Sequence, residues 1–266
     1  MIAFTDVSVR YPRQPRSALD GVTLVAERGV VTAVVGPNGS GKSTLVRALL
    51  GRVPLAGGDI ALEGRSMRGM ARDAIARRVA VVTQREEPTF PISVRDYVTL
   101  GRLPHRGTWA RDTAADRAAV HDALGRTEML ALAHRPVHEL SGGEWQRVRF
   151  ARALAQAGDA FVADEPTTFL DVAHEMAVFE LVGAVAREGR AVLMVSHQLN
   201  LVARFADRLV LLHDGRVAAA GSVDEVMRGD VLERVYQWPL VVTRDPAVGA
   251  PALVPLRKPT PPPTVP

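Results

Sequence analysis

A glycine-rich run at residues 36–43 has the composition of a phosphate-binding loop. It reads Gly-Pro-Asn-Gly-Ser-Gly-Lys-Ser, and a threonine follows. Glycines around a tight turn let backbone N–H groups approach phosphate oxygens, which a Cβ atom would block. Lys42 is expected to neutralise the β and γ phosphates of a nucleotide, and the Ser43 hydroxyl to bind Mg²⁺. The alternative, a glycine-rich turn without a ligand, is disfavoured by the complete motif. The nucleotide-binding candidates here are Gly36, Pro37, Asn38, Gly39, Ser40, Gly41, Lys42, Ser43 and Thr44.

Two adjacent carboxylates follow the short apolar run 160–163. At the carboxyl end of a buried parallel strand, Asp164 is suited to hold Mg²⁺ directly or through water. Glu165 is the natural base for a water molecule that attacks the γ phosphate. Paired acids in a turn are usually only solvated, but the phosphate loop favours the functional interpretation.

Other polar residues also lie next to predicted strands or helices. His197 follows the predicted strand 191–195 after Ser196, where it could donate to the γ phosphate or to the attacking water; most strand-end histidines are structural. The Ser-Gly-Gly run at 141–143 precedes a predicted helix at 144–156 and suits an anion or an ordinary N-cap. Tyr11 ends the first strand, where its ring could stack on adenine or simply pack.

Periodicity predicts the elements that position these residues. A strand at 30–35 and a helix at 42–50 flank the glycine-rich loop, and 2–10 with 22–26 form an antiparallel pair. The fold class is therefore α/β, with an N-terminal antiparallel β subdomain and a helical segment inserted at about 85–158. Further strands are expected at 59–63, 79–83, 160–163, 191–195, 208–212 and 216–220, and further helices at 71–78, 111–124, 144–156 and 172–187.

Composition limits the class of protein. A chain of 266 residues with 47% hydrophobic content can bury a large core, and no apolar run is long enough for a membrane-spanning helix. The N-terminus shows no signal-peptide pattern, and the sequence contains 0 cysteines. The chain is therefore expected in the cytosol. The net charge of +4 comes from scattered arginines with only 5% aromatic residues, which disfavours nucleic-acid binding. Residues 241–266 are proline-rich and are predicted to form an extended or disordered tail.

These motifs together resemble those of the nucleotide-binding subunits of ABC transporters, over residues 1–236 within an ATPase domain expected at 1–240. The resemblance assigns the following positions: the Walker A loop at 36–43, the Q-loop Gln84, the signature at 140–144, Walker B at 160–164 followed by Glu165, the D-loop Asp171, the switch His197 and the A-loop Tyr11.

The resemblance implies an ATP- and Mg²⁺-dependent ATPase that works as a head-to-tail homodimer. ATP would lie between the Walker A loop of one copy and Ser141, Gly142 and Gly143 of the other. Gln84 would sense Mg²⁺ and the attacking water. The helical insertion would contact two copies of a transmembrane permease, at the cytoplasmic face of a bacterial inner membrane, with a periplasmic substrate-binding protein acting indirectly.

Two segments, 83–94 and 100–105, resemble the importers for iron chelates, haem and cobalamin, and a Gly-Arg-x-Pro-His sequence favours haem. Siderophore or cobalamin import is the close alternative. A soluble ABC ATPase that acts on nucleic acid, and an exporter subunit, are the rivals from other classes. The chain departs from the family pattern at Trp145 and in the run 167–169, which leaves the geometry around Phe169 open.

Overall fold

A computed structural model describes residues 1–84, 86, 91–106, 111–167 and 170–257. Its centre is a six-stranded sheet in the order β10-β9-β3-β8-β7-β6. Strands β9, β3, β8, β7 and β6 are parallel, and β10 is antiparallel to β9. The strands are β3 (Val31–Val35), β6 (Val79–Val82), β7 (Ala160–Asp164), β8 (Ala191–Val195), β9 (Arg208–His213) and β10 (Arg216–Ser222).

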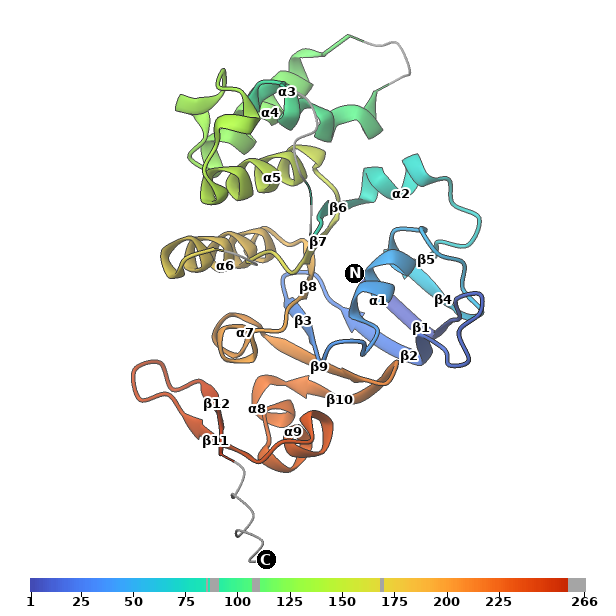
Figure 1. Cartoon of the computed structure of the whole chain (residues 1–266). Helices are drawn as coiled ribbons and strands as arrows, with labels where there is room; N and C mark the ends of the chain where they lie inside the picture. The colour runs from blue at the N-terminus through green and yellow to red at the C-terminus, as the bar shows by residue number, and fades with distance from the viewer. Residues whose placement is uncertain (85, 87–90, 107–110, 168–169, 258–266) are drawn as a thin grey trace, which may run out of the picture.

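A second sheet, of four antiparallel strands, lies beside the first (Figure 1). It contains the predicted N-terminal pair, in which Ile2 faces Ala26 and Phe4 faces Leu24. The pair and the antiparallel β subdomain are therefore confirmed. The strands of this sheet are β1 (Ile2–Val9), β2 (Leu19–Ala26), β4 (Gly57–Leu62) and β5 (Arg65–Ser66).

Helices cover the central sheet and fill the connection between β6 and β7, where α3, α4 and α5 gather at the top of Figure 1. Helix α7 (Leu199–Phe205), directly after the β8 strand end, has no counterpart among the predictions. The remaining helices are α1 (Lys42–Leu49), α2 (Arg72–Arg78), α3 (Val94–Thr99), α4 (Ala114–Arg126), α5 (Gly142–Gln156), α6 (Val172–Arg187), α8 (Val223–Val226) and α9 (Gly229–Tyr236), with short 3-10 helices at Leu100–His105, Leu130–Leu132 and Val137–Glu139.

The core forms on both faces of the central sheet. All residues of β3, β7 and β8 are buried, as the continuous apolar runs in the sequence require of parallel strands covered on both sides. Neighbouring residues point to opposite faces, so that Val35 joins the cluster that includes Phe150 and Phe179, while Val34 joins the cluster beneath the antiparallel sheet. The carboxyl ends of β3, β6, β7 and β8 consequently share one edge.

The prediction of a disordered tail from residue 241 was wrong for residues 241–255. Strands β11 (Leu240–Arg244) and β12 (Pro251–Pro255) form an antiparallel hairpin. Prolines are compatible with this arrangement because they lie at the ends of an edge strand, where no ladder donor is required. The Asn200 side chain anchors the hairpin to α7 through hydrogen bonds of 2.8 and 3.1 Å with the backbone of Leu253. The remainder of the predicted tail, 258–266, lies outside the described residues.

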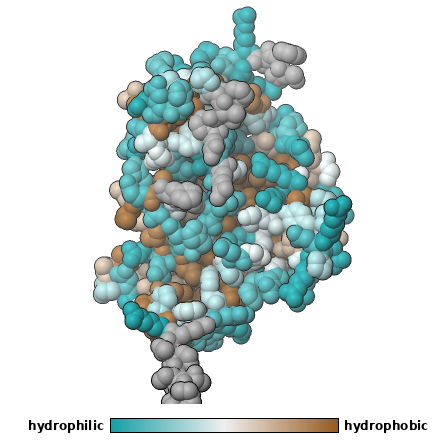
Figure 2. Space-filling view, viewed as in Figure 1, coloured by the Kyte–Doolittle hydropathy of each residue, from teal (hydrophilic) through white to brown (hydrophobic). Residues whose placement is uncertain are grey.

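Much of the surface seen in Figure 2 is hydrophilic, with hydrophobic residues scattered among the polar ones. Within the described part of the chain, no helix combines the length and apolar character required to cross a membrane.

Candidate functional site

The glycine-rich loop connects the end of β3 to the start of α1, as the sequence predicted. Gly36 has a φ of 147°, and a Cβ atom there would lie 2.1 Å from the Leu212 carbonyl oxygen. At Gly41, with a φ of 107°, a Cβ would lie 2.6 Å from the Ala18 carbonyl oxygen. The backbone at both positions is therefore open only to glycine, because neighbouring segments pack closely against the loop.

Lys42 is buried inside this loop. Its Nζ donates to the carbonyl oxygens of Gly36 at 2.7 Å and Pro37 at 3.0 Å. Burial lowers the pKa of Lys42, although the charges of Glu165 and Asp164 act in the opposite direction. The helix that follows begins at an N-cap glycine without a side-chain cap, so its first N–H groups suit an anion.

Asp164 lies at the end of β7 with 8% of its surface exposed. Burial, and then the charge of Glu165, raises the pKa of Asp164 to about 6. Its Oδ1 is buried and has no hydrogen-bond partner among the described residues. A buried carboxylate oxygen with an unused lone pair fits a hard cation such as Mg²⁺.

Glu165 and His197 meet across the ends of β7 and β8. His197 Nδ1 lies 2.5 Å from Glu165 Oε2, and the Glu165 N–H donates to the Val195 carbonyl at 2.9 Å. Glu165 has a φ of 49°, in the left-handed region that non-glycine residues seldom adopt. The glutamate is mostly buried, whereas the histidine is half exposed.

A cavity of about 300 Å³ collects the predicted residues of this edge. Its lining includes residues 38–44 together with Tyr11, Gln84 and Glu165. Gln84 follows β6 and is exposed. The structure thus brings together side chains from four parts of the sequence around the glycine-rich loop.

Tyr11 is fixed beside the loop through its hydroxyl. The Tyr11 hydroxyl lies 3.4 Å from Thr44 Oγ1, and Arg47 Nη1 donates to it at 3.4 Å. Burial raises the pKa of Tyr11, but these hydrogen bonds and the Arg47 charge outweigh burial and lower it overall. Sequence reasoning did not select Arg47, although it follows Thr44 by one helical turn, a spacing that places the two on one helix face.

Ser141, Gly142, Gly143 and Asp171 do not line this cavity in the described part of the chain. Ser141 is the N-cap of α5 in a capping box with Glu144, so the helix begins at Gly142, earlier than the predicted residue 144. The Ser141 hydroxyl accepts from the Glu144 N–H at 3.3 Å. The ordinary N-cap is therefore present within a single copy of the chain.

Asp171 is the N-cap of α6, and its Oδ1 contacts His174 Nδ1 at 2.7 Å. A Cβ at Gly143 would lie 2.3 Å from His174 Cδ2, so the imidazole packs directly against the start of α5. His174 thereby connects two segments that the sequence singled out separately. Its position three residues after an aspartate N-cap was the available signal. The departure at Phe169 lies outside the described residues.

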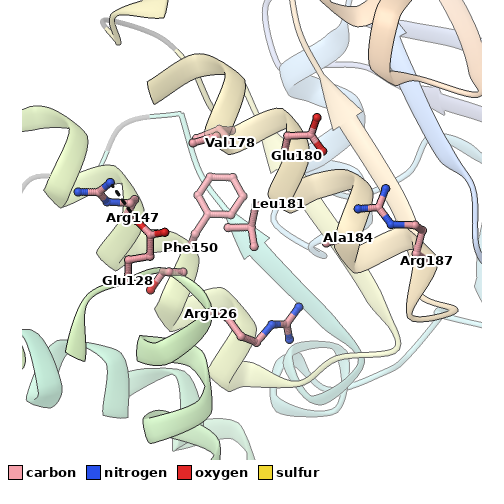
Figure 3. A pocket seen from close by; sticks show the side chains of 11 residues that line it. Arg126, Glu128, Arg147, Phe150, Val178, Glu180, Leu181, Ala184 and Arg187 are labelled. Carbon is pink, nitrogen blue, oxygen red and sulfur yellow. Dashed lines mark ion pairs between the residues drawn. The ribbon is translucent and has the colours of Figure 1, made fainter. Parts of the chain in front are cut away.

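A separate cavity of about 400 Å³ lies between α5 and α6 and contains none of the predicted site residues. Figure 3 shows Phe150 and Leu181 facing each other in it, with an ion pair of 3.9 Å between Arg147 and Glu128 at one side. Its lining lacks the glycine-rich loop and the strand-end carboxylates, so it is unrelated to the site described above.

Comparison with protein families matches residues 19–168 to the family described as ABC transporter. The match begins at β2 and ends just after the strand-end carboxylates, so it includes the glycine-rich loop, Gln84 and the start of α5.

Two relatives are similar over nearly the whole chain. The hemin import ATP-binding protein of Streptomyces coelicolor is 43% identical over 92% of this chain and 86% of its own length. The iron(3+)-hydroxamate import ATP-binding protein of Bacillus subtilis is 35% identical over 89% of this chain and 88% of its own. Among solved structures, a metal-chelate type ABC transporter in an inward-facing conformation superimposes with a TM-score of 0.84, at 26% identity, over 97% of this chain and 98% of the other.

Proposed function

Because this chain belongs to the ABC transporter family and hydrolyses ATP, we propose that it energises a bacterial importer for hemin. The sequence identity of 43% to a hemin import protein, over 92% of the chain, supports this substrate above hydroxamate, for which the identity to an import protein is 35%. The observation that carries the catalytic part is the Glu165–His197 hydrogen bond, 2.5 Å long, beside the cavity of the glycine-rich loop.

The triphosphate would occupy that cavity. Lys42 would exchange its two carbonyl partners for the β and γ phosphates, and the first N–H groups of α1 would add the helix dipole. The Tyr11 ring, held by its hydroxyl beside Thr44, would stack on the adenine.

A magnesium ion would be held by Ser43 and Asp164, with Gln84 in reach from the end of β6. The buried, unpartnered Oδ1 of Asp164 supports this assignment. When bound, the ion would neutralise charge on the β and γ phosphates.

Glu165 would accept the proton of the attacking water. Its Oε2 already contacts an imidazole, and His197 would orient the carboxylate or donate to the γ phosphate. The strained backbone at Glu165 is of the kind that proteins retain where a side chain must be aimed.

A second copy would complete the site. The residues Ser141, Gly142, Gly143 and Asp171 line no part of the cavity formed by the loop of their own chain, which is the arrangement expected if they serve the facing copy. The exposed start of α5 would then present its N–H groups to the γ phosphate.

The helical segment at about 85–158 would transmit this event to two copies of a permease at the cytoplasmic face of the inner membrane. Gln84 supports this path because it lines the nucleotide cavity directly before that segment. A periplasmic binding protein would deliver the substrate on the other side. Residues 1–240 would form the ATPase domain, with the C-terminal hairpin docked on α7.

The test is uptake by vesicles that contain this chain and the permease that co-purifies with it. ATP-dependent uptake of hemin, with no uptake of ferric hydroxamate or cobalamin, is expected. Preferential uptake of either competitor would reassign the substrate. Salt-sensitive retention of the chain on DNA or RNA, without any association with the permease, would favour the nucleic-acid ATPase instead.

A further inference from the structure

A second cross-link joins the turns after β7 and β8, next to the Glu165–His197 contact. Thr167 Oγ1 donates to Gln198 Oε1 at 2.9 Å. Gln198 Nε2 in turn donates to Glu175 Oε1 at 2.5 Å, on the first turn of α6. One amide side chain therefore connects three separate segments of the chain.

This cross-link is anchored at both ends. Thr167 is only 3% exposed, and the Gln198 N–H donates at 3.1 Å to the hydroxyl of Ser196, which is 1% exposed. The Ser196 N–H donates at 3.2 Å to the carbonyl of Val34, on the strand that leads into the glycine-rich loop. Thr167 and Ser196 are buried, and the hydrogen bonds of the Gln198 amide are partly buried. Breaking them would leave polar groups short of partners, so the hydrogen bonds oppose separation of the two turns.

The residues of the cross-link are neighbours in sequence of the candidate catalytic pair. Thr167 follows Glu165 by two residues, and Gln198 directly follows His197. Moving either turn would change the separation between the carboxylate and the imidazole. A displacement of about 1 Å at reacting groups can cost about 100-fold in rate.

We propose that Gln198 is a positioning residue that fixes the distance between Glu165 and His197 by holding their turns to Glu175. The inference rests on the proposed catalytic role of that pair. Gln198 is not among the described residues that line the cavity of the glycine-rich loop, so it acts only through the two turns.

An exchange of the amide and the carboxylate tests this idea. Gln198→Glu would place like charges together where the present donor and acceptor are 2.5 Å apart. We expect kcat for ATP hydrolysis to fall about 10-fold or more, with KM for ATP unchanged within about 2-fold. The double variant Glu175→Gln with Gln198→Glu exchanges donor and acceptor while leaving an acceptor for Thr167, and we expect kcat within about 3-fold of wild type.

Gln237→Glu is the matched control, because it makes the same change at an exposed residue after α9 and should leave kcat unchanged. Melting temperature and binding of a fluorescent ATP analogue are measured on every variant. A wild-type rate in Gln198→Glu, or no recovery in the double variant, would overturn the inference. A Gln198→Glu variant that loses both nucleotide affinity and melting temperature would also overturn it, because these losses would indicate a structural role.

Wild-type hydrolysis and its loss in Glu165→Gln are measured first. Absence of wild-type hydrolysis would overturn the function on which the inference rests. A normal Gln198→Glu rate in an active wild-type background would overturn the inference alone.

Discussion

Glu165 and His197 are joined by a contact of 2.5 Å between Oε2 and Nδ1, although they lie 32 residues apart in the sequence. The contact exists because β7 and β8 are parallel neighbours, paired from Ala160 with Ala191 to Asp164 with Val195. Glu165 directly follows β7, and His197 is the second residue after β8. The pairing of these two strands in the central sheet therefore brings the candidate base and its partner together.

Glu165→Gln should remove hydrolysis while leaving ATP binding intact, because the amide keeps the shape of the side chain but cannot accept the proton of water. We expect kcat to fall by about 100-fold or more. Steady-state phosphate release and binding of a fluorescent ATP analogue measure the two properties. Glu180→Gln, on the exposed side of α6, is the control for loss of a carboxylate. Rapid turnover in Glu165→Gln would remove Glu165 as the base.

Asp164→Asn should stabilise the nucleotide-free chain above pH 6. The pKa of Asp164 is raised to about 6 in the folded state, above its ordinary value of 3.8, so the folded chain binds the proton more tightly than the unfolded chain. Stability from this group therefore falls as pH rises from about 4 to 6 and stays low above that. The neutral amide avoids this loss, which we place at about 1–3 kcal/mol.

Thermal melts from pH 4.5 to 8 measure this effect. The advantage of Asp164→Asn should shrink as pH falls through 6, and it should be accompanied by weaker Mg²⁺ dependence of ATP binding. An Asp164→Asn chain that melts below wild type at pH 8 would contradict the buried, unpartnered state of this carboxylate.

Two glycines of the same loop should respond differently to alanine. Gly36→Ala places a Cβ 2.1 Å from the Leu212 carbonyl oxygen. We expect the free energy of unfolding to fall by roughly 3 kcal/mol or more. At Gly39 a Cβ has no atom within 4 Å, so only the cost of the left-handed backbone remains, about 1–2 kcal/mol. Urea unfolding of the two variants measures the difference, and equal losses would contradict the loop geometry.

The candidate catalytic residues at the edge of the central sheet could be predicted because the sequence signals for them are local. Asp164 and His197 each follow a short apolar run, and strands of this type end at one edge of a parallel sheet. The glycine-rich loop is recognised from the spacing of its own glycines and lysine. These features need no knowledge of distant contacts.

Contacts between segments far apart in the chain could not be predicted from the sequence. The ring of His174 against Gly143 and the link from Thr167 to Gln198 depend on how α5 and α6 meet the sheet, which no single segment specifies. The C-terminal hairpin was missed for a related reason. Its proline content suggested disorder, whereas two hydrogen bonds link Leu253 in the hairpin to the side chain of Asn200, 53 residues earlier in the chain.

In the proposed dimer, two copies of the chain share each ATP site. Lys42→Ala and Ser141→Arg chains are purified separately, mixed in equal amounts, and assayed for ATP hydrolysis alone and together. Each variant alone should be inactive, because every site in its dimer carries one defect. Mixed dimers contain one intact site, so the mixture should recover up to about a quarter of the wild-type rate. Full activity in either variant alone would contradict the shared site.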